Sequence, residues 1–311
     1  MNRIPEFLAY YSLSAKMGDI DPAHPVAVYI CDRYELTQEQ RIWMAFLYGA
    51  TYCFPTAFYI YNEFPENFDV DIPRMERWWS GHKHQTVFQT DRQWIKSRNQ
   101  FVDMFKSYSE TCGNSQTETY QGMYSANPYE FYDRAYRYFG KVYQMGRFTL
   151  FNYLDNVKHV AGFNLEPETI DWRTAQSSRN GLCFALGRDD LLRGHNYPSS
   201  PLKSEDYSFL ETGFQSLMQC LRAKFPKLHP DVFAAETVLC ALKKYYRGKR
   251  YPGYYLDRQY SEICKMQGLV TEGVDWSPLL EARREIFRSE HLIEDGARNS
   301  ELASLRLSAE L

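Results

Sequence analysis

The residues best suited to hold an anion lie between Val238 and Arg258. This stretch is rich in basic side chains and contains a single aspartate, Asp257, although the whole chain carries a formal net charge of −3. Lys and Arg bind phosphate oxygens, and the planar Arg fork can hold two oxygens at once. The pattern indicates a phosphate-binding surface; the alternative is a helix end whose charges only complement the helix dipole. The candidate cations are Lys243, Lys244, Arg247, Lys249, Arg250 and Arg258.

A second candidate for phosphate contact is the turn at Gly146. The helical pattern of residues 128–155 breaks at this glycine, which predicts two helices joined by a short hairpin. Backbone N–H groups at the start of a helix can hold a DNA phosphate without reading base sequence. Gly146 allows close approach to the backbone, Arg147 adds a positive charge, and Thr149 belongs to the same hairpin segment. A single glycine between helices is also common in an ordinary turn, and this alternative stays open.

The composition is that of an ordinary globular protein. The 311 residues suffice for one large or two modest domains, with 44% hydrophobic and 24% charged residues. Aromatic residues reach 16%, with 25 Tyr, which suits polar clefts and stacking surfaces or, alternatively, a Tyr-rich core. No apolar run approaches the roughly 18 residues that span a bilayer. The seven scattered Cys indicate reduced thiols in a cytoplasm and show no zinc or iron–sulfur spacing.

Signals for helices dominate the chain. Residues 37–54 are apolar on almost every side, which predicts a helix in the middle of the core. Pro55 interrupts the pattern, and residues 56–64 predict a second helix. Further helices are expected to begin at Pro230-Asp231 and at Ser277-Pro278, the second because Pro fits the first helical position.

The remaining segments complete a mainly α fold. A capping box at residues 90–93 predicts a helix that runs to Tyr108. Residues 27–31 fit either a strand or a helix, and the polar, small residues of 109–127 predict a surface loop or an insertion. We expect residues 1–296 to form one helical unit, with two lobes and a cleft as an alternative arrangement, and residues 297–311 to form a weakly ordered tail.

The order of these segments resembles that of the helix-hairpin-helix DNA glycosylases. Those enzymes contain two successive buried helices, a helix with a basic face, a glycine-containing hairpin and, further on, an essential Asp. Gln40–Pro65 resembles the first pair, Asp91–Tyr108 the basic helix, and the Gly146 turn the hairpin, while Asp171 stands where the Asp is expected. The match departs from the pattern at Gln144, which occupies the position of the first hairpin glycine.

Five longer phrases together resemble one family over nearly the whole chain. They lie at Gln40–Tyr48, Tyr61–Pro65, Ser178–Cys183, Glu236–Cys240 and Gly248–Gln259. The family that they resemble is the amino-acid:DNA transferases of bacterial viruses, also called α-glutamyl/putrescinyl thymine pyrophosphorylases. The resemblance implies a glycosylase-like helical fold with family-specific insertions, applied to a different chemistry.

The resemblance also implies a substrate and a reaction. The substrate is DNA in which 5-hydroxymethyluracil has been pyrophosphorylated by a separate kinase. An amine displaces pyrophosphate from the 5-methylene carbon, and glutamate, glycine or putrescine can serve as the donor. No cofactor is required, although a divalent ion could accompany the pyrophosphate. The reaction would take place in the cytoplasm of an infected bacterium, without a membrane.

This chemistry suggests roles for individual residues. Asp171 could accept a proton from the incoming amine or orient it; alternatively, it only caps the segment that starts at Trp172. Glu63 could bind the amino group of the donor, or it could be structural. Stabilisation of the leaving pyrophosphate requires cations and N–H donors. The residues assigned to contact with pyrophosphate or DNA phosphate are Arg179, Asn180, Arg188, Lys243, Arg247, Lys249, Arg250, Tyr251, Tyr254 and Arg258.

Two other functions remain open at this point. A DNA glycosylase or lyase would cleave the bond between base and sugar, and a lyase would need a Lys nucleophile in the region of Lys158. A non-catalytic helix-hairpin-helix protein would only bind DNA, and it would tolerate the change of Asp171 to Asn. His82 and His84 form a His-x-His pair without a nearby acidic or Cys partner in sequence, so no metal site is expected. His195 could carry protons, supported by its residue type alone.

Overall fold

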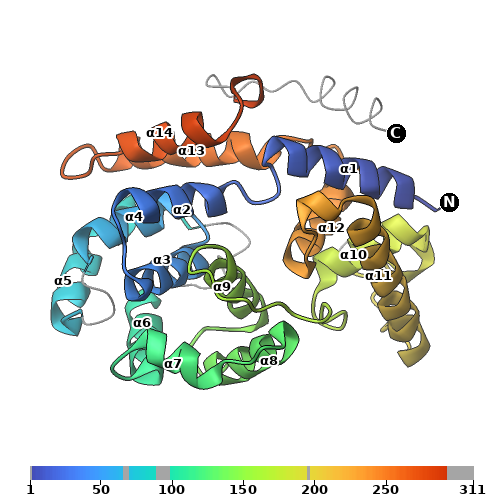
Figure 1. Ribbon diagram of the computed structural model, residues 1–311, viewed down its shortest axis with the longest axis horizontal. Helices are drawn as coiled ribbons and strands as arrows, with labels where there is room; N and C mark the ends of the chain where they lie inside the picture. The colour runs from blue at the N-terminus through green and yellow to red at the C-terminus, as the bar shows by residue number, and fades with distance from the viewer. Residues whose placement is uncertain (1, 66–69, 89–98, 195–196, 293–311) are drawn as a thin grey trace. The chain divides into compact units, whose positions relative to one another are not determined.

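The computed structural model describes residues 2–65, 70–88, 99–194 and 197–292 (Figure 1). Over these ranges the regular elements are α-helices and short 3₁₀ helices, and the described residues contain no strand. The predicted mainly α class is therefore confirmed, and residues 27–31 belong to a helix. The capping box at 90–93, His195 and the tail 297–311 lie outside the described residues.

Contacts between Cα atoms divide the chain into two compact units. Unit 1 consists of the described residues within 2–22, 167–258 and 287–292. Unit 2 consists of the described residues within 23–166 and 259–286. Unit 1 contains α1 (Ile4–Met17), α10 (Gln176–Leu186), η3 (Asp189–Leu191), α11 (Ser204–Lys224), η4 (Pro226–Leu228), α12 (Val232–Tyr245), the start of α13 (Tyr254–Leu269) and η5 (Ser289–His291). Unit 2 contains α2 (Ala23–Arg33), α3 (Gln38–Thr51), α4 (Phe54–Glu63), α5 (Ile72–His82), η1 (Lys83–Gln85), α6 (Phe101–Cys112), α7 (Gln116–Met123), α8 (Pro128–Phe139), α9 (Arg147–His159), the remainder of α13 and α14 (Ser277–Ile286).

The core of unit 2 forms where α3 packs against α9 and α4 (Figure 1). Trp43 and Phe46 of α3 are fully buried, as the all-round apolar pattern predicts. Tyr108 stacks on Phe46 at 3.9 Å between ring centroids, and its hydroxyl lies 2.8 Å from that of Tyr153. Gly49 permits the close approach of α9, because a Cβ atom there would lie 2.9 Å from the Cα atom of Tyr153. Part of the high Tyr content therefore serves this core.

The prediction of a surface loop over residues 109–127 is wrong, because this region contains the end of α6 and all of α7. A contact with a distant helix stabilises α7. The carboxylate of Glu39, on α3, accepts hydrogen bonds from the N–H of Gln116 (3.1 Å) and of Thr117 (2.6 Å) at the start of α7. Burial raises the pKa of Glu39, but hydrogen bonds from Ser115, Thr117 and Gln116 lower it more, so the pKa lies below its ordinary value.

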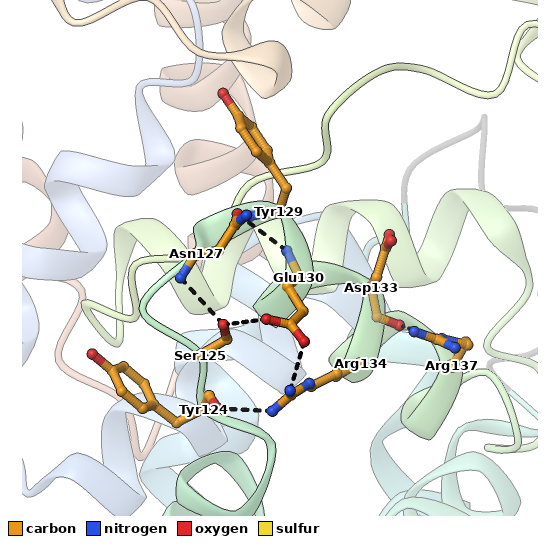
Figure 2. Close-up of polar contacts among 8 residues, drawn as sticks. All are labelled: Tyr124, Ser125, Asn127, Tyr129, Glu130, Asp133, Arg134 and Arg137. Carbon is orange, nitrogen blue, oxygen red and sulfur yellow. Dashed lines mark hydrogen bonds and ion pairs between the residues drawn. The ribbon is translucent and has the colours of Figure 1, made fainter.

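The helix that precedes the hairpin begins with a network of exposed polar side chains. Figure 2 shows Asn127, the N-cap of α8, accepting hydrogen bonds from the N–H of Tyr129 (2.9 Å) and Glu130 (3.4 Å). The Glu130 carboxylate accepts from Ser125 Oγ (2.7 Å) and from Arg134 Nη2 (2.6 Å). Such caps satisfy N–H groups that have no acceptor inside the helix. They fix the start of the helix that leads to Gly146.

Unit 1 is organised around the contact between α10 and α12, which α1 also joins. Gly181 of α10 makes this contact possible, because a Cβ atom there would lie 2.1 Å from the carbonyl oxygen of Leu239 on α12. Asp231 caps α12 by accepting from the N–H of Ala234 (2.8 Å), which confirms the predicted start of that helix. Among the described residues, no helix has the length and apolarity required to cross a membrane.

Candidate functional site

Unit 1 encloses one arginine of the basic segment, Arg250. This residue is 9% exposed, and its guanidinium carbon lies 3.6 Å from the ring centroid of Tyr254 and 4.9 Å from that of Tyr255. Such contacts stabilise a cation over aromatic faces. The Nη1 atom is buried and has no hydrogen-bond partner within the described parts of the chain. Buried donors are rarely left in this way, so Arg250 has an N–H group whose hydrogen bond the described residues do not supply.

The position of the two tyrosines depends on a residue far away in sequence. Asp19 is 1% exposed, and its carboxylate accepts hydrogen bonds from the N–H of Gly253 (2.6 Å), Tyr255 (2.8 Å) and Leu256 (3.0 Å). Asp19 thereby caps the start of α13. Its carboxylate occupies the backbone N–H groups that could otherwise bind a phosphate at this helix end. Sequence reasoning missed this residue, because no local pattern connects positions that are 234 residues apart.

Two further cations of the basic segment are held at the end of α12. Lys243 is buried and donates a hydrogen bond from Nζ to Ser177 Oγ (2.8 Å), and its burial lowers the pKa. Arg247 is exposed and donates to the hydroxyl of Tyr197 (2.5 Å), whose ring it also covers. Lys249 is exposed. The segment therefore combines the buried Lys243 with the exposed Arg247, which contacts Tyr197, and the exposed Lys249.

The acidic residue of the basic segment is also bound. Asp257 is buried, and its carboxylate accepts a hydrogen bond from the hydroxyl of Tyr251 (2.8 Å). Arg258, the next residue, is half-buried. Tyr251 therefore contributes a structural contact on α13 in addition to any role toward a phosphate.

Arg179 and Asn180 lie inside unit 1 and bond to the backbone. Arg179 donates from Nη1 to the carbonyl oxygens of Trp172 (2.9 Å) and Arg173 (3.2 Å), whereas its buried Nε has no partner among the described residues. Asn180 donates to the carbonyl of Arg193 (2.7 Å) and accepts from the N–H of the same residue (3.3 Å). These two side chains hold the loops on either side of α10.

Asp171 lies at an exposed turn that Arg179 contacts. Its Oδ1 accepts from the N–H of Arg173 (3.0 Å), and its Oδ2 accepts from the hydroxyl of Thr174. Its carbonyl oxygen accepts from the N–H of Ala175 (2.8 Å), which leads into α10. The fold thus brings Asp171 and Arg179, two predicted site residues, to the same turn. The local geometry is also that of the capping role that the sequence left open.

Arg188 is a half-buried residue with two contacts of its own. It forms an ion pair with Asp190 (2.7 Å), and its guanidinium carbon lies 4.6 Å from the ring centroid of Phe209.

The predicted site residues are divided between the two units. Asp171 and the residues between Arg179 and Arg258 that were assigned to pyrophosphate or DNA phosphate belong to unit 1, whereas Glu63 and the hairpin belong to unit 2. Glu63 ends α4, where its carboxylate and its carbonyl oxygen both accept from Arg74 Nη2 (3.1 and 3.0 Å).

The predicted hairpin lies in unit 2, where residues 140–146 connect α8 to α9. Gly146 is the exposed N-cap of α9, and a Cβ atom there would meet no described atom within 4 Å. Gln144, at the position of the missing glycine, has φ of +61°, the left-handed conformation that favours glycine. Arg147 is half-buried and Thr149 is buried. The turn therefore keeps a backbone shape that a glycine would adopt, and it leaves space above Gly146.

A polar group on α9 was missed by the sequence reasoning. Asn152, Asp155 and His159 recur at helical spacing along α9, and His24 of α2 joins them. The ligand atoms of His24, Asp155 and His159 all lie within 4.8 Å of one another. The polar spacing on α9 was readable in the sequence as a stripe on one face, but nothing there indicated that His24 would join it.

Comparisons with known proteins identify the family of the chain. The model of the family described as amino acid:DNA transferase matches residues 15–251, which is most of the chain. A protein of Salmonella phage ViI named serinyltransferase is 26% identical over 260 residues, covering 75% of this chain and 60% of its own length. The chain thus spans less than two thirds of that relative, and no solved structure matches. On the extent of the family match, the chain belongs to the amino acid:DNA transferase family.

Proposed function

We propose that this protein transfers an amino acid to pyrophosphorylated 5-hydroxymethyluracil in DNA and releases pyrophosphate, as part of thymine hypermodification. The family match over residues 15–251 is the observation that carries the proposal. The amine nitrogen forms a bond to the 5-methylene carbon of the base, while the bond from that carbon to the pyrophosphate oxygen breaks. The electron pair leaves with the oxygen, and the amine loses a proton. The reaction balances without an oxidant or a reductant.

Arg250 is the residue we assign to the leaving pyrophosphate. A group that gains negative charge in the transition state is stabilised by donors held in place beforehand. The buried Nη1 of Arg250 meets this requirement, because Tyr254 and Tyr255 hold the guanidinium and no described residue accepts from that atom. The end of α12 adds two further positive charges to unit 1, the buried Lys243 and the exposed Arg247. Asp171 remains our proposal for the group that receives or orients the amine.

The Gly146 turn is our proposal for contact with the DNA backbone. It offers a helix N-terminus with an exposed glycine and Arg147 beside it. Contacts of this kind fix the register of the protein on DNA without selecting a sequence. The target base must leave the stack before its 5-methylene group can be enclosed. A separate enzyme that pyrophosphorylates the base must act first, in the cytoplasm of the infected cell.

The name of the phage relative suggests serine as the first donor to test. A lyase reaction is less well supported, because the ammonium group of Lys158 forms an ion pair with Glu166 (3.2 Å) and both side chains are largely buried. The nitrogen that a lyase would use as its nucleophile is thus already held by a carboxylate.

The test is mass spectrometry of nucleosides from DNA that carries pyrophosphorylated 5-hydroxymethyluracil, after incubation with the protein and single amino acids. We expect a nucleoside heavier than thymidine by one donor, together with one pyrophosphate per modified base. The Arg250→Lys variant keeps the charge but loses the Arg fork, and we expect its kcat to fall about 10²–10³-fold, as when one transition-state donor is removed. Arg134→Ala, an exposed change on α8, is the control. Free base and abasic sites would identify a glycosylase instead, and unchanged DNA with every donor would refute the proposal.

A further inference from the structure

Three side chains from two helices of unit 2 form a compact set of possible metal ligands. Asp155 Oδ1 lies 3.4 Å from His159 Nε2, and Asp155 Oδ2 lies 3.9 Å from His24 Nε2. The two imidazole rings stack with 4.7 Å between centroids and 18° between planes. Neither the proposed transfer reaction nor the sequence pattern gives these residues a role. We propose that His24, Asp155 and His159 bind one divalent transition-metal ion.

The donor set suits such an ion. Two imidazole nitrogens and one carboxylate oxygen are ligands that zinc, cobalt, iron and manganese accept, whereas calcium and magnesium prefer oxygen alone. Ligand atoms about 2.1 Å from a tetrahedral ion lie about 3.4 Å from one another. The pair formed by Asp155 and His159 already has this separation, and the whole set lies within 4.8 Å. Rotation of the exposed His159 side chain would bring its nitrogen onto the same ion.

A fourth donor lies next to His24. The Oδ1 atom of Asn156 is 2.8 Å from His24 Nε2, and the Nδ2 atom of Asn156 donates to the carbonyl of Ala45 (3.3 Å). The hydrogen bond to Ala45 on α3 orients the amide so that its oxygen faces the imidazole. Asn156 can therefore complete the coordination shell or receive the proton of His24 when no ion is bound.

The burial of the group agrees with a site that a small ligand can reach. His24 and Asp155 are each 8% exposed, whereas His159 is exposed. Burial of a carboxylate is unfavourable unless a positive group accompanies it, and a divalent ion would supply that charge. Sites with three protein ligands and one side toward solvent typically leave a coordination position for water or substrate. The structure therefore assigns an accessible site rather than a closed structural one.

The backbone that carries these ligands is firmly packed. Asp155 and His159 are separated by one helical turn on α9, so they project from the same face. Gly49 lets α3 approach the backbone of α9 at Tyr153, and the ring of Tyr48 meets that of His24 edge-on, with 6.1 Å between centroids. Packed supports of this kind hold ligands in position before an ion arrives.

The experiment uses the full chain without a histidine tag, freed of metal by a chelator. Titration with Co²⁺ is followed by visible absorption, and titration with Zn²⁺ by calorimetry. We expect one ion per chain, and we expect His159→Ala to weaken binding by at least about tenfold, a lower limit taken from the effect of changing groups around a metal site. Because His159 is exposed, this variant is expected to fold, and its circular dichroism spectrum checks that expectation.

The matched control is His84→Ala. His84 is also an exposed histidine of unit 2, and it belongs to the His-x-His pair of the sequence. We expect this variant to bind the ion with the affinity of the wild type. The proposal is overturned if the wild type takes up neither ion, or if His159→Ala binds as tightly as His84→Ala. Either result leaves the proposed transferase reaction untouched, because that reaction is measured by the modified nucleoside.

Discussion

Removal of the Asp19 carboxylate should destabilise unit 1 and weaken the contact with pyrophosphate at the same time. In Asp19→Ala, the N–H groups of Gly253, Tyr255 and Leu256 lose their acceptor. Each buried donor that is left without a partner costs about 1–3 kcal/mol. Entry of water will compensate in part, so we expect the free energy of unfolding to fall by about 3–5 kcal/mol, which is similar to the cost of removing one partner of a buried charged pair.

Asp19→Asn separates the loss of charge from the loss of shape. The amide keeps one oxygen that can accept two of the three N–H groups, but its NH₂ group faces the third. We expect a loss of about 1–3 kcal/mol, corresponding to one unsatisfied donor. The control is Asp275→Ala: Asp275 is exposed and accepts from the N–H of Ser277 (3.0 Å). Removal of that exposed cap should cost about 0.5–2 kcal/mol.

The assay is urea unfolding followed by circular dichroism, combined with measurement of pyrophosphate release. Because Asp19 sets the positions of Tyr254 and Tyr255, which hold Arg250, we expect Asp19→Asn to raise KM for pyrophosphorylated DNA even where the variant is fully folded. The reasoning is refuted if Asp19→Ala unfolds at the same urea concentration as Asp275→Ala. A stability loss with unchanged KM would retain the cap but reject its link to Arg250.

Three other outcomes are expected. If Asp171 takes part in proton transfer, Asp171→Asn should lower kcat as strongly as Asp171→Ala. If Asp171 only caps the turn, Asp171→Asn should retain activity, because the Asn side chain still accepts hydrogen bonds. Steady-state rates of both variants distinguish the two roles. Gly181→Ala should destabilise unit 1 by about 1–3 kcal/mol through overpacking, because the added Cβ would meet the carbonyl of Leu239. The control is Gly268→Ala, where a Cβ meets no described atom within 4 Å, and thermal melts should show it to be neutral or stabilising. The pKa of Glu39 is lowered in the folded state, so its contribution to stability is present above the unfolded pKa and lost as pH falls through the folded pKa. Glu39→Gln should therefore destabilise the protein near pH 7 and match the wild type near pH 3 in urea unfolding; an equal difference at both pH values would contradict this.

Helices whose signals are local were predictable from the sequence. The apolar residues around Trp43 place α3 in the core, and Asp231 and Ser277-Pro278 begin α12 and α14. Pro55 marks the start of α4, where it lies in the first turn, while α3 already ends at Thr51. These elements are encoded by side-chain pattern and capping residues over a few turns, so no knowledge of distant contacts is needed.

Elements that depend on distant partners were not predictable. α7 is short and polar, and it is stabilised by the Glu39 carboxylate, which no pattern within residues 109–127 reveals. The same limitation applies to the candidate site. The charge pattern found Arg250, but it gave no sign of Asp19, and it could not show that Arg179 and Asn180 bond to backbone atoms inside unit 1. Residue types indicate what a side chain can bind, whereas only the fold decides which partner it meets.

The placement of α1 in unit 1 has a consequence for synthesis on the ribosome. α1 is made before α12, a helix that it packs against, and more than 200 residues, which include all of α2 to α11, lie between the two. Until α12 is made, the buried Tyr10 lacks the ring of Tyr245, which it meets edge-on in unit 1. Closing a loop of this length is slow, and exposed aromatic surface favours aggregation in the meantime. The nascent α1 segment is therefore a part of the chain that a chaperone would need to shield, and slower translation would lengthen its exposure.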